Sequence, residues 1–342
     1  MPCPFPHPVW FVGIDVGRSW LDAAGEGAAG EGAAGEGAAG RAALPRRVAN
    51  EATGIAALAA ALAALAPRLV VLEATGTYHR PLLAALLAAG LPTAGANPTD
   101  VAAFRTTCRG REETDRADAK LLARYAAVHG ATLRRAVPAD PVQARLRELV
   151  AYRDDLVAEQ TRATNRLHAV GFGGDPAVAS WLKADLARIA ARLKEVAAGS
   201  ARLLATLPAA ALLVAMPGVA ATTAAAVLGY LPAGVWGNAA AAAAYAGVHP
   251  RRAQSGQRDH SRLSKQGHAP LRRYLWMAAL AAIRWDPSLA AVRDRLVARG
   301  HAPKSAVCAV MHKLLRRMMG RIRAHYAAMA AAPDGTDLAL AA

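Results

Sequence analysis

The chain has 342 residues, which is enough for two or three compact units with a sizeable core. Its formal net charge is +16, and 17 lysines and arginines but only 3 acids lie between Tyr245 and Tyr326. This concentration of positive charge favours a polyanionic partner such as nucleic acid. Solvated helix faces in an arginine-rich composition are the alternative explanation. Three widely spaced cysteines argue against a disulfide framework or a structural zinc and for a reducing cytoplasm, and the N-terminal MPCPFPHPVW lacks the basic start and apolar stretch of a signal peptide.

Residues 8–136 are predicted to form an α/β domain. Two apolar strands are expected, WFVGIDVG, which ends at Asp15, and RLVVLE, which ends at Glu73, and alanine-rich helical stretches follow them. This alternation favours a fold with the strands in its core. Residues 25–40 form a Gly-Glu-Ala repeat of low complexity without an apolar face, which we interpret as a flexible insertion at a hairpin tip that carries no chemistry.

Four acids stand out by position. Asp15 and Glu73 end strands, whereas Asp115 and Asp118 stand at the predicted start of a helix, where an i, i+3 spacing puts both on one face. Acids at strand ends beside an acidic helix face can converge on a pair of divalent metal ions, and Mg²⁺ prefers such oxygen ligands. Each acid alone is explained as a turn former or as an acid near a helix N-terminus. Unpaired carboxylates at buried strand ends are costly, so the four together favour a metal site.

Residues 140–207 follow a helical pattern. Apolar residues recur with a 4–3 spacing along two stretches joined by the turn GFGGDP, and Arg153 and Gln160 fill two polar positions of the seam. The pattern predicts an antiparallel helical hairpin or a dimerising coiled coil. Core packing within one chain is the alternative to oligomerisation.

Residues 208–326 are predicted to form a mostly helical domain, followed by a flexible tail at 327–342. No charged residue occurs from Leu203 to Pro250, but prolines and glycines interrupt this stretch, so buried helices are expected there and no membrane span. The sequence MPGVAATTAAAVLG lies within the stretch. A turn-rich segment from Gly247 to Gly267 then precedes basic helices.

The second candidate site is YAGVHPRRAQSGQRDHSRLSKQGHAPLRRYL, which places Ser255 before a glycine. A serine hydroxyl that attacks a phosphodiester needs positive charge to stabilise the pentacoordinate phosphorus, and clustered arginines can supply it. From the chemistry alone a turn role for Ser255 is favoured, and Ser261 and Ser264 are equally available. The cations expected to contact nucleic acid are Arg251, Arg252, Arg258, Arg262, Lys265, Arg272 and Arg273.

Several strings resemble one known family. GIDVGRSWLDAA, EATGTY and TDRADAKLLARYA look like the signatures of the DEDD-type transposases of bacterial insertion sequences, the IS-one-ten family, and AGVHPRRAQSG followed by SKQGHAPLRRYL is similar to that family's C-terminal transposase domain. Apart from the repeat, the resemblance covers roughly residues 10–325. It implies a RuvC-like, ribonuclease-H-type N-terminal domain and assigns the DNA nucleophile to Ser255. The family's metal-binding acids fall on Asp15, Glu73, Asp115 and Asp118.

The resemblance also implies an activity. A transposase of this family is expected to cleave and exchange DNA strands through a covalent phosphoserine, with two Mg²⁺ ions held by the four acids. It implies a composite centre in a homo-oligomer, a dimer or a tetramer, and an element-encoded guide RNA that pairs with donor and target DNA. The expected location is the bacterial cytoplasm, at the nucleoid when bound to DNA.

Three features depart from the family's pattern. MPGVAATTAAAVLG resembles a helix-hairpin-helix whose loop amides contact DNA phosphates, but Ala220 stands where relatives usually have a second glycine, so a plain packing turn is equally expected. Glu113 replaces a basic residue found in many relatives. The Gly-Glu-Ala repeat is the third departure.

Two other functions fit parts of the sequence. A metal-dependent, structure-selective nuclease of the Holliday-junction-resolvase kind would use water as its nucleophile, and it would need the four acids but not Ser255. A non-catalytic nucleic-acid-binding protein would need neither, so that Asp15→Asn would leave every activity unchanged.

Overall fold

The computed structural model describes residues 10–27, 44–73, 77–108, 114–138, 140–255, 258–264 and 266–330. The chain divides into two compact units, Met1–Pro138 and Ala139–Ala342, called here the N-terminal and the C-terminal unit. Most of the Gly-Glu-Ala repeat, Glu113 and Lys265 lie outside the described residues.

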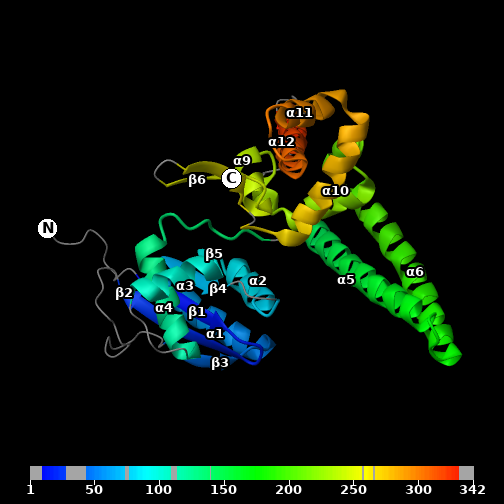
Figure 1. The fold of residues 1–342 in the computed structure, drawn as a ribbon. Coiled ribbons are helices and arrows are strands. Elements are labelled where there is room, and N and C mark those ends of the chain that lie inside the picture. Colours follow the sequence, from blue (N-terminus) through cyan, green and yellow to red (C-terminus); the bar gives the residue numbers. More distant parts are fainter. Residues whose placement is uncertain are drawn as a thin grey trace, which may run out of the picture. The chain divides into compact units, whose positions relative to one another are not determined.

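The N-terminal unit is built on a mixed five-stranded sheet with the order β3-β2-β1-β4-β5 (Figure 1). Its strands are β1 (Trp10–Val16), β2 (Trp20–Gly27), β3 (Arg47–Ala49), β4 (Leu69–Glu73) and β5 (Thr93–Ala96). β1 pairs with β2 and β2 with β3 antiparallel, whereas β1, β4 and β5 run parallel. This arrangement confirms the predicted α/β fold of the ribonuclease-H type.

The sequence predicted β1 and β4 but missed β2, β3 and β5. β2 runs into the Gly-Glu-Ala repeat, and its last residues have low strand propensity. They adopt a strand because β1 supplies the pairing partners, with Trp10 opposite Gly27. The first three residues of the repeat therefore belong to the sheet instead of a flexible insertion.

Helices cover both faces of this sheet. α1 (Ala52–Leu65) and α2 (Arg80–Ala88) pack on one face, and α3 (Pro98–Thr107) and α4 (Asp115–His129) on the other (Figure 1). α4 lies very close to β1, because a Cβ added at Gly13 would lie 2.2 Å from the backbone oxygen of Ala119. Glycine at position 13 therefore permits the close approach that brings the start of α4 to the strand ends.

The C-terminal unit begins with two long antiparallel helices, α5 (Pro141–Val170) and α6 (Pro176–Ala205). Each starts at an Asp-Pro pair whose aspartate caps the helix N-terminus, which is the combination that favours a sharp helix start. Leu156, Ile189 and Val196 are buried between the two helices. Arg153 does not stay in this seam, since its Nη1 donates to the hydroxyl of Tyr274 at 3.1 Å.

The rest of the C-terminal unit is mostly helical, as predicted. Leu228, Leu275, Leu314 and Met318 are almost fully buried in its core. The last helix extends to Ala330, beyond the expected start of the tail. The helices are α7 (Pro208–Val214), α8 (Ala221–Tyr230), the short η1 (Ala233–Val235), α9 (Ala239–Ala246), α10 (Ala269–Trp285), α11 (Pro287–Ala298) and α12 (Pro303–Ala330).

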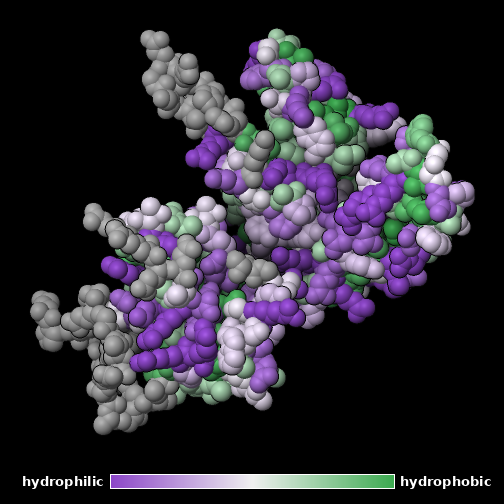
Figure 2. Space-filling view, turned by 60° about the horizontal axis from the view of Figure 1, so that its bottom comes forward, coloured by the Kyte–Doolittle hydropathy of each residue, from purple (hydrophilic) through white to green (hydrophobic). Residues whose placement is uncertain are grey.

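The long uncharged stretch forms short helices, and the eight residues of α8 from Thr223 to Tyr230 are buried. Among the described residues no single helix is long and apolar enough to cross a membrane. The bent pair α6 and α7, with an angle of 113° between them, passes that test by length and composition only. On the face shown in Figure 2, hydrophilic side chains surround smaller hydrophobic patches.

The segment expected to be turn-rich contains an antiparallel ribbon, β6 (Pro250–Ser255) and β7 (Arg258–Leu263). Its polar, basic sequence lacks the alternation of apolar residues that predicts a strand, which is why sequence analysis missed it. At the base of the ribbon, Gly267 packs against Gly247, and a Cβ added at Gly267 would lie 2.5 Å from the Gly247 nitrogen. Gly247 and Gly267 also have positive φ angles, which allow the sharp turns at the two ends of the ribbon, where it joins α9 and α10.

Candidate active site

Three elements of the N-terminal unit bring the predicted acids together. Ile14 on β1 pairs with Leu72 on β4, so the next residues, Asp15 and Glu73, follow at the same edge of the parallel pair. Asp115 and Asp118 lie in the first turn of α4, where the hydroxyl of Thr114 caps the helix by accepting from the Ala117 amide at 3.2 Å.

The pKa of Asp15 reflects both its burial and the other acids near it. Burial is the largest cause that raises the pKa of Asp15 from 3.8 to about 6, and the negative charges of Asp118, Asp115, Glu73 and Asp22 contribute the rest, in decreasing order. A cavity of about 570 Å³ beside the acids is lined by residues that include Glu73, Asp115 and Asp118. The four predicted acids therefore share one electrostatic environment.

Sequence analysis missed a fifth acid and two arginines at this site. Asp22 lies directly opposite Asp15 across the β1–β2 pair and is 5% exposed. The Nε of Arg47 on β3 lies 3.0 Å from both Asp22 oxygens, and its Nη2 lies 2.9 Å from Oδ2 of Asp115. Arg105 on α3 places Nη2 2.8 Å from Oδ1 of Asp118. Asp22 stands in the motif GIDVGRSWLDAA, and a hairpin prediction there would have put it beside Asp15.

The donor chemistry of this site fits a divalent cation. The carboxylate oxygens are hard ligands, and their negative charges repel one another. The buried Oδ1 of Asp118 lies beside Arg105 but accepts no well-oriented hydrogen bond from the described residues. No three acid, histidine or cysteine side chains in the described part of the chain lie close enough together to form a complete metal-binding group. Asp115 and Asp118 would have to exchange an arginine for the ion.

The ribbon of the C-terminal unit carries Ser255 at the end of β6, where it pairs with Arg258 beside the turn. Arg251 is exposed, and its Nη1 lies 3.5 Å from Oε1 of Gln266. The side chains of Arg252, Ser255, Arg258 and Arg262, and the whole of Lys265, are outside the described part of the structure.

Arg272 and Arg273 on α10 have contacts within the fold. Arg272 donates from Nη1 to the Ala246 carbonyl at 3.2 Å, and Nη2 of Arg273 lies 2.9 Å from Oδ1 of Asp154. Asp154 also accepts from the hydroxyls of Tyr230 at 3.2 Å and Tyr274 at 2.7 Å. Burial, together with these hydrogen bonds to a carboxylate, raises the pKa of Tyr274 to about 12. This polar network, which includes Arg273, links α5, α8 and α10, and Arg272 separately connects α10 with the end of α9.

The turn MPGVA between α7 and α8 packs against α10. Gly218 has a φ of 82°, and a Cβ added there would lie 2.3 Å from the Ala282 nitrogen. The structure therefore supports the packing-turn interpretation of this motif at Gly218, because a side chain would separate the turn from α10. Ala220 begins α8 without a side-chain cap.

A ribonuclease-H-type sheet with acids at two strand ends and a helix start, followed by a basic helical unit, suits an enzyme that acts on nucleic-acid phosphodiesters. Residues 12–170 match the family model of a DEDD-type transposase domain, and residues 210–294 match the model described as transposase, IS116/IS110/IS902 family. The two matches together span more than two thirds of the chain. The chain belongs to the IS110 family of insertion-sequence transposases. Comparison with curated proteins gives no significant match.

Proposed function

We propose that this transposase cleaves and rejoins DNA through Ser255, with the acids Asp15, Glu73, Asp115 and Asp118 holding two Mg²⁺ ions. The observation that carries the proposal is that the ends of β1 and β4 and the first turn of α4 carry four acids from three separate motifs, whose charges help to raise the pKa of Asp15. When bound, the ions would polarise the phosphate and stabilise the leaving oxygen.

The residues of the chain have distinct parts in this proposal. The Ser255 hydroxyl attacks phosphorus and loses its proton to solvent, a bond from phosphorus to Oγ forms, and the bond from phosphorus to the departing sugar oxygen breaks as that oxygen takes up a proton. The cations of the ribbon, with Arg251 exposed at its base, stabilise charge on phosphorus. Arg47 and Arg105 hold the Asp115 and Asp118 carboxylates through ion pairs, and bound ions would replace these contacts.

The proposal includes a guide RNA and a homo-oligomer. The positive charge of the C-terminal unit supports contacts with both DNA and RNA. Phe172, in the turn between α5 and α6, is 80% exposed, and Trp181, on α6, is 67% exposed; such aromatic side chains support a contact with a second subunit. Cleavage by this centre then depends on assembly.

The test is covalent capture. The full chain, with the RNA transcribed from its flanking DNA, is incubated with Mg²⁺ and labelled junction DNA, and adducts are resolved under denaturing conditions and mapped by mass spectrometry. The wild type and Ser261→Ala are expected to form an adduct, whereas Ser255→Ala and Asp15→Asn are expected to form none.

Each other result has a defined meaning. An adduct that persists in Ser255→Ala contradicts the serine assignment. Cleavage without any adduct, retained in Ser255→Ala and lost in Asp15→Asn, assigns the protein to the nuclease class. DNA binding without cleavage in every variant contradicts catalysis altogether.

A further inference from the structure

The last helix of the C-terminal unit carries an accumulation of positive charge that the proposed reaction does not use. α12 contains Lys304, Lys313 and four arginines but no acid over its 28 residues. We propose that the middle of α12, together with the turn at Met216 and Pro217, forms a docking groove for the phosphate backbone of DNA. This inference rests on the proposal that the chain acts on DNA, and it adds a surface for holding that DNA.

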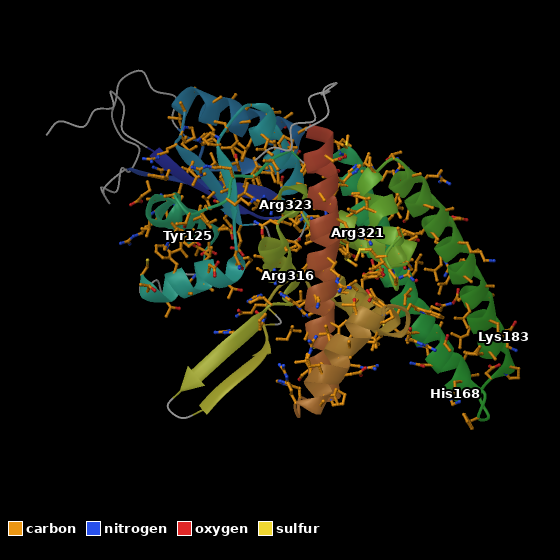
Figure 3. All side chains as sticks on the ribbon, turned by 90° about the horizontal axis from the view of Figure 1, so that it is seen from above. Tyr125, His168, Lys183, Arg316, Arg321 and Arg323 are labelled. Atoms are coloured by element: carbon orange, nitrogen blue, oxygen red, sulfur yellow. The ribbon has the colours of Figure 1, made fainter. Side chains whose placement is uncertain are left out.

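The arginines are arranged on two sides of a glycine. Residues three, four and seven apart share a helix face, so Arg316 and Arg323 flank Gly320 on one side, and Arg317 and Arg321 flank it on the other. Figure 3 shows Arg321 on one side of α12 and Arg316 and Arg323 on the opposite side. Gly320, Arg316, Arg321 and Arg323 are all exposed.

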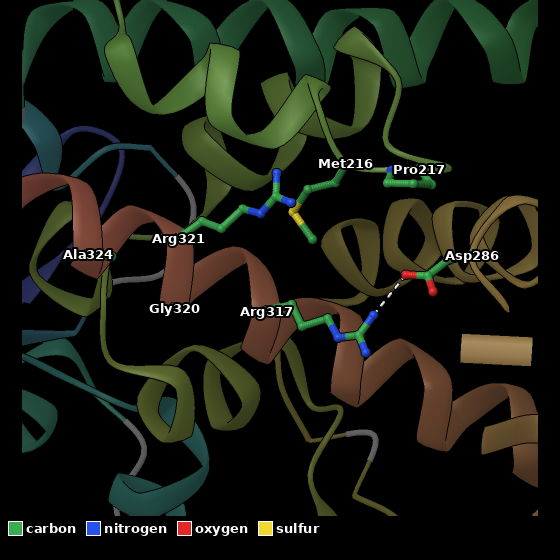
Figure 4. Close-up of a pocket in the computed structure, with 7 residues that line it drawn as sticks. All are labelled: Met216, Pro217, Asp286, Arg317, Gly320, Arg321 and Ala324. Carbon is green, nitrogen blue, oxygen red and sulfur yellow. Dashed lines mark hydrogen bonds and ion pairs between the residues drawn. The ribbon is translucent and has the colours of Figure 1, made fainter. Parts of the chain in front are cut away.

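A groove lies along the Arg317 and Arg321 side. It has a volume of about 410 Å³, and Met216 and Pro217 form the wall opposite α12 (Figure 4). Arg321 extends across it toward Met216, and its Nη1 lies 3.3 Å from the Leu212 carbonyl, a long hydrogen bond that leaves most of its donors free for a ligand.

The one acid in the groove does not oppose a phosphate strongly. Asp286 caps α11, and its Oδ2 lies 2.8 Å from Nη1 of Arg317. This ion pair neutralises both groups, so the role of Arg317 is to stabilise the fold by joining α12 to the start of α11. Arg316 and Arg323 have no acidic partner among the described residues. They lie outside the groove, on the other side of Gly320 from Arg321, so a phosphate backbone that leaves the groove across Gly320 would meet them next.

Gly320 provides the second observation. A glycine inside an exposed helix weakens that helix, and the usual reasons for one are a positive φ or a close internal contact. Gly320 has neither, because it lies in regular helix and a Cβ added there would meet nothing within 4 Å. The free space above Gly320 would let a phosphate backbone approach the helix closely between the two pairs of arginines.

The first experiment measures binding of the full chain to a short DNA duplex by fluorescence anisotropy between about 50 and 200 mM salt. The variant replaces Arg316, Arg321 and Arg323 by Gln. We expect affinity to fall about tenfold or more, and the slope of log affinity against log salt to decrease by about 2–3, because each lost phosphate contact removes roughly one unit.

The matched control removes the same number of positive charges, three, from α6 through Lys183→Gln, Arg188→Gln and Arg192→Gln. Arg188 and Arg192 already pair with Asp185 and Glu195 of the same helix, at 3.1 and 2.7 Å. The control is expected to lower the salt slope by less than about one unit. Equal effects of the two triple variants would show that only net charge matters and would overturn the groove.

The second experiment separates binding from folding. Gly320→Ala and Gly320→Leu favour the helix, so both are expected to raise the thermal midpoint, whereas Gly320→Leu should weaken DNA binding about threefold or more by filling the space above the helix. Higher stability with unchanged DNA affinity would overturn the part assigned to Gly320.

Three further outcomes are distinguishable. If the α12 variants weaken binding to an RNA duplex of the same length but not to DNA, the assignment of the groove to DNA is wrong. If the wild type binds no DNA, the proposed function itself fails. If the wild type binds DNA and the triple arginine variant binds equally well, only the groove fails.

Discussion

The acidic site of the N-terminal unit and the basic face of α12 both concentrate charge of one sign, but the fold treats them differently. Asp15, Glu73 and Asp118 are partly buried whereas Asp115 is exposed, and burial together with repulsion between the acids raises the pKa of Asp15 to about 6. Arg47 and Arg105 relieve part of that repulsion. Arg316, Arg321 and Arg323, around Gly320, are exposed, so water and salt screen them. Repulsion between like charges therefore destabilises the fold more at the acidic site than on α12, and this favours a bound cation at the acidic site.

The largest expected effect tests how α4 reaches the acidic site. Gly13→Ala places a methyl group 2.2 Å from the Ala119 carbonyl oxygen, so α4 must move away from β1. We expect a loss of about 3 kcal/mol or more in the free energy of unfolding, measured with urea. Gly320→Ala is the matched control, because its methyl group meets open space and should stabilise. A small loss in Gly13→Ala would mean that α4 is not tightly packed there.

The next effect concerns the polar network of the C-terminal unit. Asp154→Asn keeps the shape of the side chain but removes the charge that pairs with Arg273 and one of the acceptors for Tyr230 and Tyr274. A loss of about 2 kcal/mol in unfolding free energy is expected. Tyr152→Phe, at an exposed tyrosine on the same helix, should change little. Equal stability of Asp154→Asn and the wild type would argue against the network.

A smaller effect of opposite sign is expected in the acidic site. Because the folded pKa of Asp15 lies above 3.8, its charged form destabilises the fold, and this cost is present above pH 6 and disappears as pH falls toward 4. Asp15→Asn should therefore stabilise the protein by about 1–2 kcal/mol near neutral pH in a chelator, since solvent screens part of the repulsion. Urea unfolding at several pH values measures this gain. A gain that does not shrink below pH 6 would contradict charge repulsion as its cause.

The smallest effect is expected at exposed ion pairs outside both sites. Arg188→Gln removes the contact with Asp185 on α6, where the arginine side chain is 77% exposed. The unfolding free energy should change by less than about 0.5 kcal/mol, because water already screens the pair. A larger change, measured by urea unfolding, would mean that charges on the surface of this protein contribute more than the comparison above assumes.

The sequence by itself determined the features that depend on near neighbours. The strands that end at Asp15 and Glu73, and the i, i+3 placement of Asp115 and Asp118, follow from local patterns of apolar and acidic residues. The Asp-Pro starts and the 4–3 spacing of α5 and α6 likewise reflect local capping and helical periodicity. These patterns already favoured a grouping of the four acids, and the family resemblance supported it independently.

Only the tertiary structure decided which distant residues meet. Strand register places Asp22 opposite Asp15, and β3 carries Arg47 to both Asp22 and Asp115. The sequence did not predict the pairing of the polar ribbon, because its strands lack the alternation of apolar residues that indicates a strand. It did not predict the packing of α12 either, because arginines on several sides of a helix do not indicate which face is buried. Contacts between residues far apart in the chain depend on how whole elements pack, and so the fold selects the arginines that stay exposed.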